Sequence, residues 1–397
     1  MARKASNLAV AKAIMSHPGI LLAKPSLNLF LIRYMRKFTV IDAEGRLVLH
    51  SHLPPLNSRA YARFISEHLI RKSNGPSHAQ IGVTNACPQN CEYCYNKGRS
   101  GKVMDTETIR AVIRELKSMG VFWIGLTGGE PLLNGDLERI VESIGEDCSA
   151  KLFTTGCTLT PLRALDLMRA GLDFVSVSLD HWNEEIHDRV RGFRGAFRTA
   201  LRAIEMFMNA GGMHVSVSAV LSGDMLKTDN VEEFLAFLRR LDVHEAWLSE
   251  AKPGVNAHRT GEQVISERER LDLIALQDRY NKEGGMTVNY LGHFEDREHF
   301  GCTAGHKMVY VDPFGELSPC VFIPMTFGNV LEKPLRDIYA GMRSRFPVED
   351  RCFMNTNHGT IGGRYRGKIP LSAEDSLSVM DEVRFGPPAR FFCLQDR

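Results

Sequence analysis

Between residues 79 and 250 the sequence alternates short apolar runs, typical of buried strands, with longer segments that have helical periodicity. The apolar runs occupy 80–85, 121–127, 151–155, 173–179, 214–221 and 245–250. The helical segments between them occupy 105–119, 135–145, 161–170, 194–210 and 230–241. Strands that alternate with helices are joined by right-handed crossovers, so we expect an α/β fold with a parallel sheet. Ligands of such folds bind at the carboxyl ends of the strands, which makes the residues after each run candidates for function.

Three cysteines, Cys87, Cys91 and Cys94, lie in the loop after the first run, within T-N-A-C-P-Q-N-C-E-Y-C-Y. A structural zinc ion or a closed iron–sulfur cluster normally takes four protein ligands. The spacing C-x3-C-x2-C supplies three thiolates and leaves one metal position open to a small molecule. A zinc knuckle and a set of buried free thiols are the alternative interpretations of these residues.

Glycines and polar residues also follow the later strands. The second strand ends in Gly128, Gly129 and Glu130, followed by Pro131. Two glycines let a ligand approach the backbone closely, and a strand end has unpaired N–H and C=O groups. The fourth strand ends in S-V-S-L-D, and H-D-R-V-R-G follows it; these segments supply Ser178, Asp180 and Arg191.

Together these motifs resemble the radical S-adenosylmethionine (SAM) superfamily over about residues 80–352. The family signature is C-x3-C-x-aromatic-C, and Tyr93 occupies the aromatic position. The resemblance implies a partial (β/α)6 barrel similar to a TIM barrel. It also implies a 4Fe–4S cluster on Cys87, Cys91 and Cys94, whose open iron chelates the amine and carboxylate of SAM. The implied activity is reductive cleavage of SAM to a 5′-deoxyadenosyl radical that abstracts hydrogen from a substrate, with a low-potential electron donor such as flavodoxin or ferredoxin.

The resemblance also implies roles for the residues at the strand ends. The G-G-E-P segment would hold the methionyl amine of SAM, with Glu130 opposite its ammonium group. Ser178 and Asp180 would face the ribose or the carboxylate, and Arg191 would pair with the carboxylate through its planar guanidinium. The implied SAM-binding residues are Tyr93, Gly128, Gly129, Glu130, Pro131, Ser178, Asp180 and Arg191. The alternatives are a surface salt bridge for Arg191 and, for Ser178, a hydroxyl satisfied within the protein.

A second cysteine set lies further along the chain. Cys302 is followed by G-E-L-S-P-C, which ends at Cys320, and then by Cys352. This arrangement resembles the auxiliary-cluster extensions called SPASM and twitch, which implies a second 4Fe–4S cluster. The seven-cysteine SPASM set is absent, so one auxiliary cluster is expected, with Cys393 as its fourth ligand or with an open iron. Ordinary buried thiols and a zinc site are the alternatives.

These patterns divide the chain into three parts. Residues 1–78 form a mostly helical N-terminal extension, 79–285 form the barrel core, and 286–397 form a small twitch-like unit of β-hairpin and helix with an irregular tail. In the extension, a hairpin is expected to pair 38–41 with 46–49 around the turn D-A-E-G. No three-strand-plus-three-helix module for peptide recognition is evident in the extension.

Composition limits the partners and the cellular location that can be expected for the protein. A formal charge of +2 argues against a surface that coats nucleic acid. Nine cysteines are too few for a disulfide scaffold of this length, so we expect a cytoplasmic enzyme. The apolar stretches 19–22 and 28–37 end in basic residues, and they predict either a helix packed on the main domain or a peripheral contact with a membrane surface.

The motifs specify radical chemistry and leave both the substrate and the catalytic side chains open. A peptide, a small metabolite or cofactor precursor, and a lipid at a membrane surface are the candidate substrates. An auxiliary cluster that accepts an electron would make the modification an oxidation. A non-catalytic iron–sulfur electron-transfer protein is disfavoured, because it would need neither G-G-E-P nor an open three-cysteine site.

Overall fold

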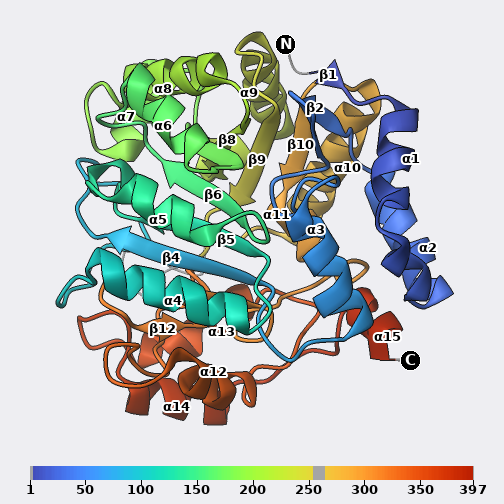
Figure 1. Ribbon diagram of the computed structural model, residues 1–397. Helices are drawn as coiled ribbons and strands as arrows, with labels where there is room; N and C mark the ends of the chain where they lie inside the picture. The colour runs from blue at the N-terminus through green and yellow to red at the C-terminus, as the bar shows by residue number, and fades with distance from the viewer. Residues whose placement is uncertain (1–2, 254–263, 397) are drawn as a thin grey trace.

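The computed structural model describes residues 3–253 and 264–396, which form a nine-stranded sheet with helices packed outside it (Figure 1). The strand order is β10-β9-β8-β7-β6-β5-β4-β11-β12. The six central strands are parallel, as the alternation predicted, and are β4 (His78–Thr84), β5 (Trp123–Gly128), β6 (Ser149–Thr154), β7 (Phe174–Ser178), β8 (His214–Leu221) and β9 (Glu245–Glu250). Among the described residues the outermost strands β10 and β12 do not pair with each other, so the sheet is a partial barrel.

The crossover helices pack against this sheet, and all except α7 bury an apolar face. They are α4 (Thr106–Ser118), α5 (Leu137–Ile144), α6 (Pro161–Arg169), α7 (Glu184–Arg191), α8 (Ala196–Ala210) and α9 (Thr228–Arg240). In α4 the buried side chains follow the i, i+3, i+4, i+7 spacing of one helix face: Ile109, Val112, Ile113 and Leu116. The sequence pattern does not predict α7, because this short helix buries the polar residues His187 and Arg191 rather than an apolar stripe.

Strands from the C-terminal part of the chain join the same sheet. β10 (Thr287–Tyr290) lies parallel to β9, and β11 (Met308–Val311) lies parallel to β4 with β12 (Leu317–Ser318) antiparallel beside it. The sheet therefore contains strands from both sides of the domain boundary predicted at 285/286. That boundary stays a prediction. α10 (Glu267–Glu283) precedes β10, and residues 254–263, between β9 and α10, lie outside the described residues.

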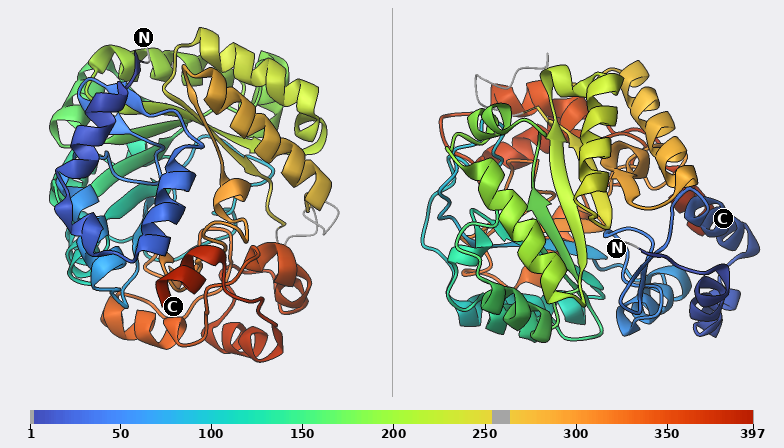
Figure 2. Two further views of the ribbon diagram at one scale, coloured as in Figure 1. Left: turned by 90° about the vertical axis from the view of Figure 1, so that its right-hand side faces the viewer. Right: turned by 90° about the horizontal axis from the view of Figure 1, so that it is seen from above.

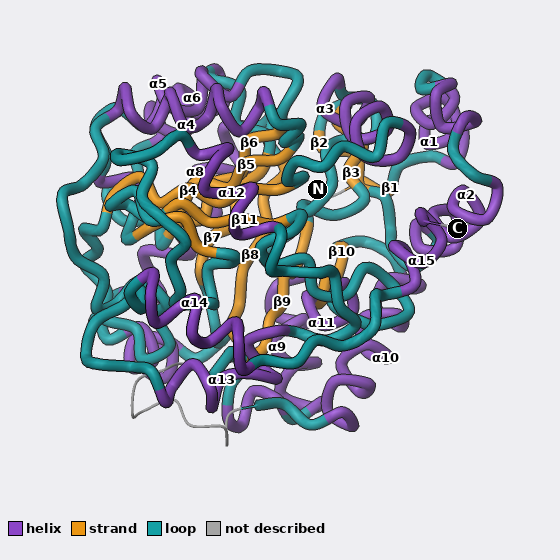
Figure 3. The backbone as a smooth tube through the Cα atoms, turned by 90° about the horizontal axis from the view of Figure 1, so that it is seen from below, coloured by secondary structure: helices purple, strands orange, loops and turns teal. Residues whose placement is uncertain are grey.

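After β10 the chain contains helices whose positions the sequence pattern does not predict. They are α11 (Leu291–Phe294), α12 (Leu335–Arg343), α13 (Phe353–Gly363), α14 (Ala373–Glu382) and α15 (Arg390–Asp396). Seen from below, α12, α13 and α14 lie in front of the sheet and are joined by long loops (Figure 3). The sequence of α13, F-M-N-T-N-H-G-T-I-G-G, is poor in helix formers, so its buried Phe353, Met354 and Ile361 supply the stability that propensity does not.

The N-terminal extension packs at the amino-terminal ends of the barrel strands (Figure 2). Its elements are β1 (Arg3–Lys4), α1 (Asn7–Met15), η1 (Pro18–Leu22), α2 (Pro25–Met35), β2 (Ile41–Ala43), β3 (Arg46–Val48), α3 (Arg59–Arg63) and η2 (Phe64–Ile70). The predicted hairpin forms, but its paired strands are shorter than expected. They pair from Ile41 opposite Val48 to Ala43 opposite Arg46. β1 adds a third strand that sequence patterns miss because it is only two residues long. Nowhere in the described chain is a helix both long and apolar enough to span a bilayer.

A buried polar network joins the extension to the floor of the barrel. The N–H and hydroxyl of Ser51 donate to the two carboxylate oxygens of Glu245 (2.9 and 3.0 Å), and Lys151 donates to the Ser51 hydroxyl (2.6 Å). Burial lowers the pKa of Lys151 to about 8, although the charge of Glu245 opposes this shift. His214 and Asn289 donate to Glu245 as well (2.9 and 2.8 Å). Each of these side chains has a hydrogen-bond partner, so the network holds the extension against the amino-terminal end of the barrel, which the extension closes.

We predict that the extension makes folding stability sensitive to acid. Burial lowers the pKa of His50 to about 4 and that of His78 to about 4, from an ordinary value of 6.5. Between pH 6.5 and 4 the unfolded chain therefore binds more protons than the folded chain, so stability is complete above pH 6.5 and falls as the pH drops through this window. The expected loss is on the order of 1 kcal/mol per histidine for each pH unit. Urea unfolding at pH 7.5 and pH 5.5 measures it.

Substituting one of these histidines provides the control for this prediction. His50→Gln retains a side chain that can pair with the Tyr34 hydroxyl, which lies 3.1 Å from the His50 ring nitrogen, and it should flatten the pH dependence. His358→Gln, on α13, should leave the dependence unchanged. A pH profile that is the same in all three proteins would show that the buried histidines do not control acid stability.

Candidate active site

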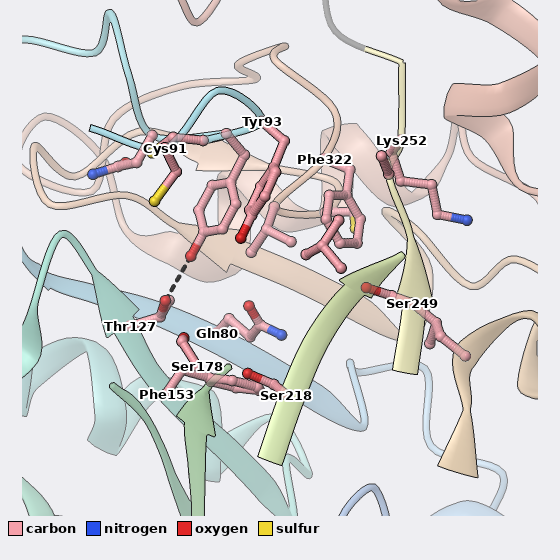
Figure 4. Close-up of a pocket in the computed structure, with 18 of the residues that line it drawn as sticks. Gln80, Cys91, Tyr93, Thr127, Phe153, Ser178, Ser218, Ser249, Lys252 and Phe322 are labelled. Carbon is pink, nitrogen blue, oxygen red and sulfur yellow. Dashed lines mark hydrogen bonds between the residues drawn. The ribbon is translucent and has the colours of Figure 1, made fainter. Parts of the chain in front are cut away.

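A cavity of about 480 Å³ opens at the carboxyl ends of the strands, where the sheet topology predicts a ligand. Figure 4 shows Cys91 and Tyr93 on one side, with Gln80, Ser178 and Ser218 from the strands facing them. Six of the predicted metal-binding cysteines line it: Cys87, Cys91, Cys94, Cys302, Cys320 and Cys352. Five of the predicted SAM-binding residues also line it: Tyr93, Gly128, Gly129, Ser178 and Arg191. The two cysteine sets, far apart in sequence, thus share one cavity.

The first three cysteines lie together in the loop between β4 and α4. Cys91 is buried, and burial raises the pKa of its thiol, as does the neighbouring Cys94, while the charge of Arg191 opposes the rise. An Arg191 Nη1 atom lies 4.0 Å from the Cys91 Sγ. A cationic side chain beside a buried thiol stabilises the thiolate that binds a metal.

The two glycines of G-G-E-P are required because the start of the cysteine loop packs directly against them. A Cβ on Gly128, whose φ is +123°, would lie 2.2 Å from the Thr84 carbonyl oxygen, and one on Gly129 would lie 2.2 Å from that of Ala86. The Gly129 N–H donates to the Thr84 carbonyl and the Glu130 N–H donates to the Ala86 carbonyl, each at 2.7 Å. This close contact fixes the cysteine loop against the end of β5.

Glu130 lies beneath the G-G-E-P turn and is fully buried. One carboxylate oxygen accepts from the Leu132 N–H (3.0 Å) and the Thr154 hydroxyl (2.6 Å). The other accepts from the Thr155 N–H (2.6 Å) and the Thr155 hydroxyl. A carboxylate has about four acceptor sites, so the protein itself occupies all of them. A contact from Glu130 to the SAM ammonium stays a prediction. In the structure, the Glu130 carboxylate connects the G-G-E-P turn to the end of β6.

We predict that Glu130→Gln destabilises the protein by about 2–3 kcal/mol, because a side-chain amide group would face N–H and O–H donors inside the protein. Chemical unfolding of the two proteins measures the difference. Glu138→Gln is the matched control, since Glu138 makes a partly exposed ion pair with Arg163 (2.8 Å) and should cost at most about 1 kcal/mol. Equal losses in the two variants would contradict the role given to Glu130.

A buried ion pair holds the cysteine loop from the other side. The Arg191 guanidinium contacts both oxygens of Asp180 (2.7 and 3.0 Å), and the Val220 N–H donates to the same carboxylate (3.0 Å). The Tyr93 hydroxyl also donates to Asp180, while the Arg191 guanidinium lies over the Tyr93 ring, 5.5 Å from its centre. The surface salt bridge considered for Arg191 is therefore a buried one. Binding of the SAM carboxylate by Arg191 stays a prediction, and Asp180 does not line the cavity.

A buried lysine, Lys252, shares the cavity with the second cysteine set and follows the end of the sixth predicted strand, where a functional residue is expected. Lys252 donates to Glu250 (2.8 Å) and Glu295 (2.7 Å) and lines the cavity with both. Burial raises the pKa of Cys352 to about 11 and that of Cys320 to about 12, while Lys252 opposes both shifts. Its place after a strand end makes Lys252 a candidate from sequence, but the sequence does not predict its ion pairs, because one carboxylate partner comes from the segment after α11.

Cys393 lies apart from the other predicted ligands. It is on α15, where its thiol donates to the Pro388 carbonyl (3.4 Å), and it does not line the cavity. Its role as a fourth ligand stays a prediction that the structure does not favour. Pro131 also lies outside the cavity and opens the short helix η3 (Pro131–Leu133).

The cavity wall contains residues that the sequence analysis does not identify. Several of them carry rings: His52, Phe153, Trp247, Phe294 and Phe322. His52 comes from the N-terminal extension, and its ring stacks on Phe294 with centroids 5.7 Å apart. The sequence pattern does not predict that His52 lines the cavity, because His52 reaches the barrel only when the extension packs against it.

Comparison with known proteins gives the class of this chain. The Radical SAM superfamily matches residues 81–241, and SPASM, an iron–sulfur cluster-binding domain, matches residues 302–355. The chain belongs to the radical SAM superfamily and carries a SPASM domain, although that segment has three cysteines rather than seven. It is a radical SAM enzyme, and its cofactors are a 4Fe–4S cluster, SAM and an auxiliary iron–sulfur centre.

Individual relatives match about two thirds or more of this chain. The AdoMet-dependent heme synthase of Methanosarcina barkeri is 26% identical over 294 residues, which is 68% of this chain and 84% of the relative. The mycofactocin maturase MftC of Mycolicibacterium smegmatis is 29% identical over 285 residues, 67% of this chain and 70% of the relative. The crystal structure of Streptococcus suis SuiB bound to precursor peptide SuiA has a TM-score of 0.57 at 16% identity and covers 72% of each chain, which shows a shared fold.

The residues of the cavity fit these cofactors. Thiolates are the ligands that iron–sulfur clusters take, and the raised pKa of Cys352 means that a bound metal must displace a proton from this thiol. The glycines at the end of β5 leave backbone exposed to the cavity, as a closely held ligand requires. In the part of the chain that the structure describes, no three His, Cys, Asp or Glu side chains converge as the ligand sphere of a single metal ion.

Proposed function

We propose that this radical SAM enzyme oxidatively modifies a peptide inside the cavity, with Cys87, Cys91 and Cys94 holding the SAM-binding cluster and Cys302, Cys320 and Cys352 holding the auxiliary one. The observation that carries this proposal is that both cysteine sets line a single cavity. A substrate in that cavity lies within reach of both clusters. When bound, the cofactors supply hydrogen abstraction from an unactivated carbon.

The chain's own residues position the reactants and exclude water. The Asp180–Arg191 ion pair and the G-G-E-P turn hold the cysteine loop in place, and Arg191 presents a cation to the cavity. Phe153, Trp247 and Phe322 form an apolar wall that shields a reactive intermediate from solvent. Within the described residues the Lys252 ammonium donates to two carboxylates, and its third N–H would serve as a donor for a substrate oxygen.

A peptide substrate is supported by the relatives. One is named as a mycofactocin maturase, and a structure with the same fold is bound to a precursor peptide. A small cofactor precursor is the second candidate, because another relative is a heme synthase that covers a similar share of this chain. The extension favours neither, since it plugs the barrel floor through the Ser51–Glu245 hydrogen bonds.

The experiment is anaerobic turnover with SAM and reductant, with short peptides encoded beside this protein's own coding sequence as substrates. We expect a peptide product lighter by two hydrogen atoms, formed together with 5′-deoxyadenosine. Porphyrin precursors serve as the second substrate set. Consumption of a porphyrin with no change in any peptide would overturn the peptide proposal and leave the radical SAM assignment intact.

A further inference from the structure

Positive charge is concentrated in the first segment of the chain. Residues 1–41 contain seven Lys and Arg side chains and no Asp or Glu, and the first acidic residue is Asp42. The whole chain has a formal charge of +2, so the remaining residues carry a formal charge of −5. Such an asymmetry marks a segment that meets an anionic partner.

The same segment exposes large apolar side chains. Five of the eleven large hydrophobic residues exposed in the described chain lie here: Leu8 (65% exposed), Met15 (69%), Leu22 (77%), Leu29 (48%) and Ile32 (48%). Leu8 and Met15 are two turns apart on one side of α1, and Leu29 and Ile32 are one turn apart on α2. Single exposed apolar residues are ordinary, but five of the eleven within residues 8–32 are a concentration that points to an interaction surface.

Cationic side chains stand among these apolar residues. Lys12 lies one turn from both Leu8 and Met15, and Arg33 and Arg36 lie one turn beyond Leu29 and Ile32. All three cations are exposed, and none forms an ion pair within the described residues. Their charge is therefore not neutralised by the rest of the described chain.

The opposite face of α2 is already used for packing. Its buried residues are Leu27, Phe30, Leu31 and Tyr34, and the Phe30 ring lies 5.8 Å from that of Phe391 on α15. In Figure 1 both α1 and α2 form the outer edge of the molecule, and the left view of Figure 2 turns this edge toward the viewer. The exposed apolar and cationic residues are thus not needed for the core.

We propose that the outward face of α1, η1 and α2 docks the enzyme on an anionic lipid bilayer. Apolar side chains of such a surface enter the boundary between headgroups and acyl chains, while Lys and Arg bind the anionic headgroups. An acidic protein partner would account for the cations, but it would not account for five exposed aliphatic side chains beside them. This docking surface goes beyond the proposed reaction and does not depend on the identity of its substrate.

The test is flotation of the reconstituted holoenzyme with vesicles of phosphatidylcholine, with and without phosphatidylglycerol. We expect binding at least about tenfold tighter to the anionic vesicles, weakening as salt is raised. Leu22→Glu/Leu29→Glu should lower this binding by about tenfold or more, because it places two carboxylates in the docking face. The matched control Leu162→Glu/Leu271→Glu alters leucines of similar exposure (64% and 54%) on other helices and should bind as wild type does.

Cleavage of SAM should be unchanged in both double variants, which shows that the fold is intact. Equal binding to neutral and anionic vesicles, or equal losses in the two double variants, would overturn the proposal. The protein could instead bind no vesicles but bind poly-glutamate, with the double variant Lys12→Glu/Arg33→Glu abolishing that binding. This outcome would assign the surface to an acidic protein partner and would also overturn the bilayer proposal.

Discussion

Anaerobically reconstituted Cys91→Ala protein should release almost no 5′-deoxyadenosine from SAM and reductant, a loss on the order of a hundredfold or more. Cys91 is the most buried thiol of its loop and lies beside the Arg191 guanidinium, and its loss leaves the loop with two of its three cysteines. Quantifying 5′-deoxyadenosine by chromatography measures the effect, and the same loss is expected for Cys87→Ala and Cys94→Ala.

Cys393→Ala is the matched control for this prediction. Its thiol lies outside the cavity and donates to the Pro388 carbonyl, so the variant should keep both its iron and its SAM cleavage. Loss of iron from Cys393→Ala would instead show that this cysteine is a ligand. Normal SAM cleavage by all three loop variants would remove the cysteine loop from the chemistry.

The second large effect is expected from Cys320→Ala, which should block product formation while 5′-deoxyadenosine is still released. Cys320 lines the cavity with Cys302 and Cys352, and an auxiliary cluster there is placed to take an electron from the substrate. Wild type should hold about eight iron atoms in two four-iron clusters, and the variant should hold roughly half of them. Iron analysis and mass spectrometry of the product measure the two effects.

Folding must be checked in this variant, because a structural cluster contributes its binding energy to the domain. β11 and β12, which precede Cys320, belong to the main sheet, so circular dichroism should remain close to that of wild type. If the folded variant forms product at the normal rate, the electron-acceptor role is wrong and the C-terminal segment is a structural lid.

The sequence predicts the barrel strands well because local pattern and global fold agree there. β8 and β9 occupy the predicted residues, since each is a buried run between helices with clear apolar periodicity. Patterns fail where tertiary contacts decide the structure. α13 is rich in Asn and Gly and is held by Phe353 and Ile361, and β1 is too short to carry a pattern.

In the candidate site, too, some residues can be predicted from the sequence and others cannot. Residues within a motif, such as Cys91 and Gly129, can be assigned to it from sequence, because their spacing is local. His52 cannot, because it reaches the cavity only after the N-terminal extension has docked. Lys252 is a candidate because it follows a strand end, but its ion pair with Glu295 depends on a distant segment. Motif spacing also does not show that Glu130 has its carboxylate filled by Leu132, Thr154 and Thr155.

The most direct test of the central assignment is electron paramagnetic resonance of the reduced protein before and after SAM is added. In wild type and in Cys320→Ala, SAM should shift one cluster signal, because the open iron on the Cys87–Cys91–Cys94 loop binds it. In the triple variant Cys87→Ala/Cys91→Ala/Cys94→Ala that signal should be missing, and SAM should leave the auxiliary signal unchanged. A SAM-dependent shift that persists in the triple variant, or none in wild type, would contradict the assignment of the SAM-binding cluster to this loop.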